Sequence, residues 1–324
     1  MKDSLAIRKR FCKDNNVSIT IFKSPYFEAR LALLDKTEEY KEFLDMIEKH
    51  FGGSEEKYFE YYNNLKDSII NYIKSSEVYN ELNNCEMGEF RVKYNNLSES
   101  DVYKVPNIGH RFISIDMIKA NFSSLVHFGL MRKLKFFKSF NWESFMKKFT
   151  NIKYFHKSKY IRQVVFGNCN PKRQVVYEKY LMCNILSLIL NDCIEETDIR
   201  IDDVFSMSSD EIIICIDRLS DNDIKALHRI VQKMSDIIVP VRSTEFTLGK
   251  VVGTKAYIKD INCENGEYVS KTELKCLDTL EAPFVIRAIN GQLPRDEDYY
   301  FIHDGKLSRL METPDISISY AKEK

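Results

Sequence analysis

The most informative stretch of this chain is Phe112-Ile113-Ser114-Ile115-Asp116-Met117, an apolar run with a carboxylate near its end. A second run, Asp210-Glu211-Ile212-Ile213-Ile214, places two acids before three isoleucines. Short runs rich in β-branched residues are typical of buried strands. We therefore predict a strand over 111–116, and a hairpin of 199–205 and 211–216 that carries the two acids at its turn.

Residues 131–173 form a basic, aromatic segment between these two runs. The segment holds 12 of the 48 Lys and Arg residues of the chain, but one of its 48 Asp and Glu residues, Glu143. Such asymmetry in a chain of zero formal net charge points to an anionic partner. Lysines and arginines neutralise phosphates, and aromatic rings can stack on unpaired bases. The alternative is that the rings are core and the lysines a solvated face, and the roughly helical spacing of Phe137, Phe140 and Phe145 favours core for most rings.

The chain divides by pattern into three regions. We expect 1–105 to be mainly helical, 106–245 to alternate strand and helix, and 246–324 to be rich in strands. A length of 324 residues fits two domains, or one large domain with an appendage. The predicted helices cover 38–51, 117–131, 172–191 and 220–235, and another starts near Ser54. The other predicted strands are 17–22, one beginning near 239–241, 246–252, 254–261, 267–276, 283–289 and 298–302, with the last ten residues loose.

Composition and targeting signals narrow the class of protein. The chain is 44% hydrophobic and 30% charged, which is ordinary for a globular protein. Its eight cysteines form no CxxC pair, and the six histidines have no ligand spacing, so reduced thiols are predicted rather than zinc. The start of the sequence has no hydrophobic signal core, and no apolar run approaches about 18 residues. We therefore expect a cytoplasmic protein without a membrane partner.

The two acidic runs suggest a chemistry. Phosphoryl transfer with two divalent metals needs carboxylates from different strands that converge on the ions, and oxygen ligands suit Mg²⁺ or Mn²⁺. Asp116 at a strand end and Asp210-Glu211 at a hairpin turn meet that requirement. The same residues also serve turn chemistry and solubility, so a purely structural role stays open. The sequence contains no P-loop, no dinucleotide fingerprint and no readable Ser-His-Asp or Cys-His arrangement.

In three places the chain resembles palm-domain nucleic-acid polymerases, the broad group of reverse transcriptases and family B DNA polymerases. The segment 114–122 looks like the family's first motif, a strand that delivers a metal-binding Asp with an aromatic residue six positions later. The segment 208–214 looks like its acidic hairpin, and 167–179 lies where the family has a nucleotide-facing loop and helix. The resemblance covers roughly 110–245, and it implies an α+β fold in which a palm-like antiparallel sheet packs against helices.

The resemblance also implies roles for individual residues. Asp116 and Asp210, with the backbone of Met117, would hold Mg²⁺ or Mn²⁺, and Glu211 would assist them. The residues expected to contact nucleotide or nucleic acid are Lys119, Lys172, Arg173, Gln174 and Lys179. The implied activity is nucleotidyl transfer, by a small polymerase or a template-independent transferase.

Two other functions remain open from the sequence. The hairpin has Ser208 where the family often has an aromatic residue and Glu211 where it has a second Asp, which allows a non-catalytic nucleic-acid binder built on a decayed palm. A third possibility is a metal-dependent nuclease that uses Asp260, Glu273 and Lys275, which have the D-x12-E-x-K spacing. Because the chain lacks obvious room for complete fingers and thumb, a protein partner subunit is also expected.

Overall fold

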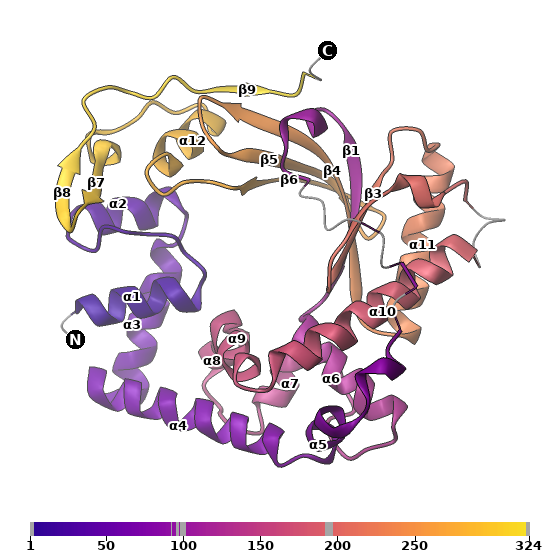
Figure 1. The fold of residues 1–324 in the computed structure, drawn as a ribbon. Helices are drawn as coiled ribbons and strands as arrows, with labels where there is room; N and C mark the ends of the chain where they lie inside the picture. The colour runs from indigo at the N-terminus through magenta and orange to yellow at the C-terminus, as the bar shows by residue number, and fades with distance from the viewer. Residues whose placement is uncertain (1–2, 92, 95–96, 98–101, 192–196, 322–324) are drawn as a thin grey trace.

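A computed structural model describes residues 3–91, 93–94, 97, 102–191 and 197–321. Its main sheet has the strand order β2-β3-β1-β4-β5-β6, with β9 beside the far part of β4, and every paired strand is antiparallel (Figure 1). The strands are β1 (Arg111–Met117), β2 (Val204–Met207), β3 (Glu211–Cys215), β4 (Val241–Val252), β5 (Tyr257–Glu264), β6 (Glu267–Lys275) and β9 (Ser317–Ser319). A separate hairpin consists of β7 (Tyr300–His303) and β8 (Lys306–Arg309).

The helices fall into three groups along the chain. The N-terminal group is α1 (Leu5–Asp14), α2 (Tyr26–Leu33), α3 (Thr37–Phe51), α4 (Glu55–Lys74) and α5 (Glu77–Asn84). The central group is α6 (Ala120–Met131), α7 (Trp142–Met146), α8 (Lys153–Lys157), α9 (Lys159–Gly167), α10 (Pro171–Asn191) and α11 (Asp221–Ile237). The C-terminal region contributes α12 (Ala282–Ile289). None of the described helices is long and apolar enough to cross a membrane.

The central part of the sheet is built from two split β-α-β units. From β1 the chain passes through α6 to α10 before it reaches β2, and β3 lies between these two strands. From β3 it passes through α11 to β4, and β1 lies between those two. The helices α10 and α11 contact β3 and β4 respectively, so both crossovers cover the same face of the sheet (Figure 1). This arrangement confirms the predicted α+β class with an antiparallel sheet.

Alternation along β1 separates the two faces. Ile113, Ile115 and Met117 point into the main core beneath the helices. The opposite face, called the second face below, carries Phe112, Ser114 and Asp116 by the same alternation. A smaller apolar cluster that includes Phe112 lies there, so the second face is apolar in the middle of β1 and polar where the strand ends.

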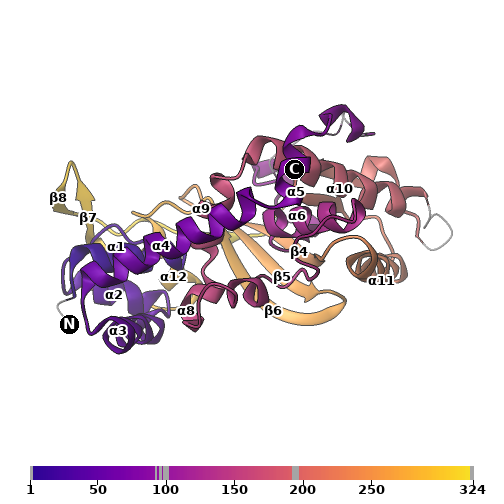
Figure 2. The same ribbon diagram turned by 90° about the horizontal axis from the view of Figure 1, so that it is seen from below.

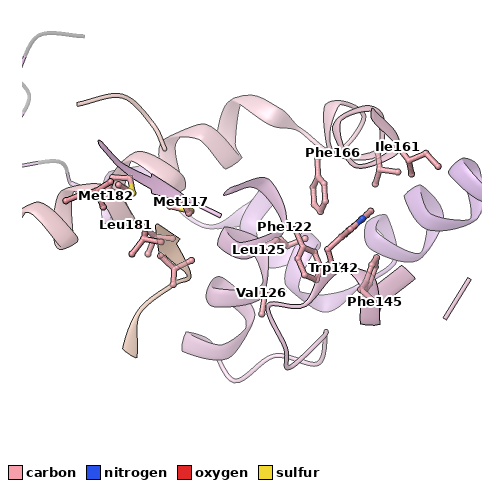
Figure 3. Close-up of a cluster of buried hydrophobic side chains, with 14 of the residues drawn as sticks. Met117, Phe122, Leu125, Val126, Trp142, Phe145, Ile161, Phe166, Leu181 and Met182 are labelled. Carbon is pink, nitrogen blue, oxygen red and sulfur yellow. The ribbon is translucent and has the colours of Figure 1, made fainter. Parts of the chain in front are cut away.

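The aromatic residues of 131–173 belong mainly to the core. Figure 3 shows Phe122, Trp142, Phe145 and Phe166 gathered beside α6, and Trp142 and Phe145 are fully buried. Phe122 and Trp142 meet edge to face, with ring centroids 5.3 Å apart. Burial of each such ring stabilises the fold by about 1.5–3 kcal/mol. The packing therefore supports the alternative in which the rings are core and the lysines face solvent.

The N-terminal helices connect the central helices to the C-terminal region. Helices α1 and α4 contact α9, and α2 contacts α12, so the elements follow one another around a circuit in Figure 1. In the turned view of Figure 2, α4 runs from the N-terminal helices toward α5. A buried ion-pair triad closes the circuit: Arg30 Nη1 lies 2.9 Å from Asp298 Oδ1, and Arg287 bonds the other oxygen of the same carboxylate.

The predicted helices are confirmed with small changes at their ends, whereas five other predictions are wrong. The predicted strand 199–205 begins only at Val204, because Ile201–Asp203 form a 3₁₀ turn. The segment 283–289 is helix α12, because Pro283 suits the first turn of a helix and Phe284, Val285 and Arg287 are its buried residues. The segment 17–22 forms no strand, and 241–252 is one continuous strand rather than two. The last ten residues, which were predicted to be loose, include strand β9, and this strand pairs with β4. Since β4 crosses position 245, one sheet spans the predicted boundary between core and C-terminal region.

Candidate active site

The register of the sheet brings together two of the three predicted carboxylates, Asp116 and Glu211. Asp116 lies directly opposite Glu211 of β3 and directly opposite Arg242 of β4. Directly opposite residues of antiparallel strands point to the same face, so all three side chains are on the second face. The Ser114 hydroxyl, two positions before Asp116, donates to Glu211 Oε1. The site therefore combines two acids, one hydroxyl and one guanidinium at the end of the central strands.

Asp116 is electrostatically perturbed. Burial raises the pKa of its carboxyl to about 6, and the negative charge of Glu211 adds to that effect. Arg242 opposes the shift, since its Nη2 lies 3.4 Å from Asp116 Oδ2. The side chain is still 38% exposed, so a ligand can reach it from solvent. A cation that binds here could therefore replace either the proton on Asp116 or its contact with Arg242.

Asp210 occupies the turn of the β2–β3 hairpin beside this pair. Its backbone carbonyl accepts a hydrogen bond from the Met117 amide at 2.8 Å, which fixes the turn against the end of β1. The hydroxyls of Ser208 and Ser209 both lie within hydrogen-bond distance of its carboxylate, at 3.3 and 3.4 Å. The Met117 side chain is buried in the core. The structure thus pairs Asp116 with Glu211 in register, and places Asp210 one residue beyond them at the turn.

A fourth carboxyl group lies near Asp210 of this turn, and the sequence patterns above did not predict it. Glu178 of α10 is buried, and burial with the nearby charge of Asp210 raises the pKa of its carboxyl to about 7. The Ser124 hydroxyl of α6 is 3.5 Å from Glu178 Oε1. The sequence held a signal for this residue: it lies on the same helical stripe as the buried Gln174, Leu181 and Ile185.

Cations continue across the second face away from the acids. Lys259 of β5 is buried with its Nζ 4.3 Å from the centre of the Phe246 ring, and burial lowers its pKa, while Glu211 and Asp116 oppose that change. Beyond it, Lys271 and Lys275 of β6 flank Glu273 at 2.9 and 3.1 Å. Both lysine side chains are at least 36% exposed. The face thus changes from acidic at β3 and β1 to basic at β5 and β6.

A second pair of cations lies at the start of α6. Lys119 has a left-handed backbone conformation, with φ of 53°, directly before the helix. Burial and the charge of Arg162 lower its pKa, while Glu143 opposes that shift. Burial also lowers the pKa of Arg162 on α9, and its Nε is a buried donor without a hydrogen-bond acceptor among the described residues. Two half-buried cations that repel each other favour an anion between them.

The other predicted nucleotide contacts are placed differently. Arg173 donates to the backbone carbonyls of Leu82 and Cys85, so its guanidinium holds α10 against the end of α5. Gln174 is buried, and its amide donates to the backbone carbonyl of Asn121. Lys172 is exposed in the first turn of α10, and Lys179 is half-buried one position after Glu178. Among the five predicted nucleotide contacts, Lys119 is the one that lies near a second cation, Arg162, and the pKa values of both groups are lowered.

The nuclease pattern does not assemble into one site. Lys259 lies opposite Glu273, whereas the next residue, Asp260, lies opposite Thr272. Adjacent strand residues point to opposite faces, so Asp260 and Glu273 are on different sides of the sheet. Asp260 instead accepts hydrogen bonds from Thr272 and Tyr320. The nuclease alternative therefore has no geometric support.

The acids at the end of β1 suit a hard divalent cation by their donor atoms, because carboxylates and hydroxyls are the ligands that Mg²⁺ prefers. Their spacing is wider than that of a closed site. Within the described ranges, the groups of three ligand atoms that all lie within 4.8 Å of one another are His110–Cys215–Asp217 and His228–Glu245–Cys263. Asp116, Asp210 and Glu211 are not among these groups.

Comparisons with protein-family models, with curated proteins and with solved structures give no match to this chain.

Proposed function

We propose that this protein is a divalent-metal-dependent nucleotidyltransferase that acts on nucleic acid, a small polymerase of the palm type. The observation that carries the proposal is the register of β1 and β3, which sets Asp116 opposite Glu211 on one face with Asp210 at the adjoining turn. Asp116, Asp210 and Glu211 are the residues that would hold Mg²⁺ or Mn²⁺. When bound, these ions would activate an attacking hydroxyl and neutralise the leaving pyrophosphate.

The remaining residues of the site fit binding and orientation. Lys119 and Arg162 would bind the triphosphate of the incoming nucleotide, because burial and the nearby charge of Arg162 lower the pKa of Lys119 and an anion would relieve both effects. Lys271 and Lys275 on the exposed basic side of the second face would contact the phosphates of a strand. The Ser114 hydroxyl would orient Glu211. A cytoplasmic location and a further protein subunit belong to the same proposal.

A second candidate function is nucleic-acid binding without catalysis. The observation that favours it is the contact between Arg242 and Asp116, which already gives the carboxylate a cationic partner. In that case the second face would bind nucleic acid through Lys271 and Lys275, and the acids would serve to hold the sheet together. The two candidates differ in one measurable property, which is turnover in the presence of a divalent metal.

The test is an incorporation assay. The full chain would be incubated with labelled single-stranded and primed DNA and RNA, all nucleoside triphosphates, and Mg²⁺ or Mn²⁺. We expect extension that disappears with a chelator and falls roughly 10²- to 10³-fold in Asp116→Asn and Glu211→Gln, because metal ions supply several kcal/mol of transition-state stabilisation.

Asp260→Asn is the matched control, since this acid of the same sheet lies on the opposite face. Its extension rate should equal that of the unaltered protein. Retention of the labelled strand without extension would support the binding candidate instead. Equal extension by Asp116→Asn and the unaltered protein would refute the assigned site.

A further inference from the structure

A second group of ligand-type side chains lies on the other face of the sheet, beneath α11. His228 of α11, Glu245 of β4 and Cys263 of β5 each present one ligand atom, and these atoms all lie within 4.8 Å of one another. His228 and Glu245 are buried, and Cys263 is half-buried. The three residues come from three separate elements, so no short sequence motif signals them.

A β-bulge turns the cysteine toward this group. Glu245 lies opposite Cys263, but the next residue of β4, Phe246, lies opposite Ile261, so Asn262 is an extra residue in β5. In a regular strand, Ile261 and Cys263 would point to the same face, because they are two positions apart. The bulge instead sends Ile261 to the cluster on the second face and Cys263 to the face beneath α11.

The distance between the His228 and Cys263 ligand atoms matches that of a tetrahedral zinc ion. Cys263 Sγ lies 3.6 Å from His228 Nε2. Zinc binds sulfur at about 2.3 Å and nitrogen at about 2.0–2.1 Å, which in a tetrahedron sets the two ligand atoms about 3.6 Å apart. A zinc ion could therefore lie between these atoms without a movement of the backbone.

Neighbouring groups hold two of the three side chains, His228 and Glu245, in ligand orientation. The Nδ1 of His228 is 2.6 Å from the Ser243 hydroxyl, which leaves Nε2 directed at Cys263. Arg111 donates to Oε1 of Glu245 at 2.7 Å, so Oε2 would be the oxygen that binds the ion. Such outer contacts are the usual support of metal-binding histidines and carboxylates. As a metal ligand, the imidazole would bind the ion in its neutral form through Nε2.

We propose that His228, Glu245 and Cys263 bind one zinc ion, which joins α11 to β4 and β5 and takes a water as its fourth ligand. On binding, the Cys263 thiol loses its proton to solvent and the thiolate sulfur bonds the ion. The site is separate from the carboxylates of the second face and does not depend on the proposed function.

The test uses cobalt as a spectroscopic probe for zinc. The full chain, reduced and treated with a chelator, would be titrated with Co²⁺ and then with Zn²⁺. We expect one equivalent of Co²⁺ to give a thiolate-to-cobalt charge-transfer band and the intense visible bands of a tetrahedral ion, and Zn²⁺ to abolish both. Cys263→Ser should lose the charge-transfer band, and Glu245→Gln should weaken Co²⁺ binding at least about tenfold.

Three controls make the assignment specific. Cys215→Ser removes the thiol of the other three-residue group, and Cys276→Ser removes an exposed thiol, so both should keep the full signal. Asp116→Asn should keep it as well, because its carboxylate is on the second face. The proposal fails if the unaltered protein shows no charge-transfer band, if Cys263→Ser retains the band, or if Cys215→Ser loses it.

Discussion

Asp116 and Glu211 are register partners in the β1–β3 ladder, so two carboxylates stand side by side on one face of the sheet. Like charges directly opposite each other in a sheet are unfavourable. Burial and this repulsion raise the pKa of the Asp116 carboxyl to about 6, and Arg242 offsets part of the negative charge by contacting Asp116 Oδ2. This is the arrangement that a bound divalent cation would relieve, and it leads to predictions that do not require an activity assay.

The first prediction concerns the proton on Asp116. Glu211→Gln removes the neighbouring negative charge and should lower the pKa of the Asp116 carboxyl toward its ordinary value. Arg242→Ala removes the positive charge and should raise that pKa further. Titration of the labelled carboxyl carbon by NMR measures both changes, and Glu60→Gln, at an exposed position of α4, should change neither. An unchanged Asp116 titration in Glu211→Gln would show that the two acids do not interact.

The second prediction concerns the stability that the folded protein loses when the carboxyl of Glu178 ionises at high pH. Its pKa is raised from 4.5 to about 7, so the folded protein binds a proton that the unfolded chain releases above about pH 4.3. This contribution to stability is complete below the unfolded pKa and disappears as the pH rises through about 7. Glu178→Gln, which needs no proton, should therefore be more stable than the unaltered protein at pH 8, by an amount on the order of 3 kcal/mol at most.

Urea unfolding at pH 5 and pH 8 measures that difference. The advantage of Glu178→Gln should be largest at pH 8 and should shrink at pH 5. Glu60→Gln on the exposed side of α4 should follow the unaltered protein at both values. A constant difference between the two pH values would mean that Glu178 carries no proton in the folded state.

Local patterns were sufficient to predict most of the helices and the central strands. Ser220, for example, caps α11 with its hydroxyl, and Asp223 completes the capping box, as the spacing of polar and apolar residues there indicates. The turn acids at 210 and 211 were also readable, because a short apolar strand follows them. These features depend on neighbours within about four positions, which a single sequence displays directly.

The features that the sequence did not reveal depend on partners far along the chain. The segment 283–289 is apolar enough for a strand, but it forms α12, which contacts α2 near the other end of the molecule. The pairing of Asp116 with Glu211 rather than Asp210 depends on the register across 95 residues, and one position decides which acid shares its face. Cys263 faces His228 because of a bulge that no local pattern marks.

The third prediction concerns the contact that closes the circuit of elements. Asp298 has a side chain that is 2% exposed, and it is bonded by Arg30 and Arg287, whose side chains are 11% and 6% exposed. Asp298→Ala leaves two buried guanidinium groups without this carboxylate and should reduce the free energy of unfolding by about 3–5 kcal/mol. The control is Asp296→Ala, two positions before Asp298, which removes an exposed ion-pair partner of Arg309. It should reduce the free energy of unfolding by about 1 kcal/mol or less. Urea unfolding compares the two, and equal losses would contradict the role of the triad.

The fourth prediction concerns the cation pair at the start of α6. If Lys119 and Arg162 bind the triphosphate, Lys119→Ala or Arg162→Ala should weaken nucleotide binding about 10- to 100-fold, because each charge-assisted hydrogen bond contributes about 1.5–3 kcal/mol. Lys172→Ala is the matched control, since Lys172 is an exposed cation that follows α9 closely in the chain. Equilibrium binding of a fluorescent nucleoside triphosphate, with Ca²⁺ in place of Mg²⁺ to prevent turnover, measures affinity without catalysis.

The comparison also separates two sources of binding energy. A site at Lys119 and Arg162 should keep most of its triphosphate affinity at 0.3 M salt, because partly buried charges are weakly screened. Binding by exposed surface lysines should instead collapse at that salt concentration and fall equally in Lys172→Ala and Lys119→Ala. That second pattern would mean that the triphosphate binds through the general positive charge of the surface, and that Lys119 and Arg162 form no specific site.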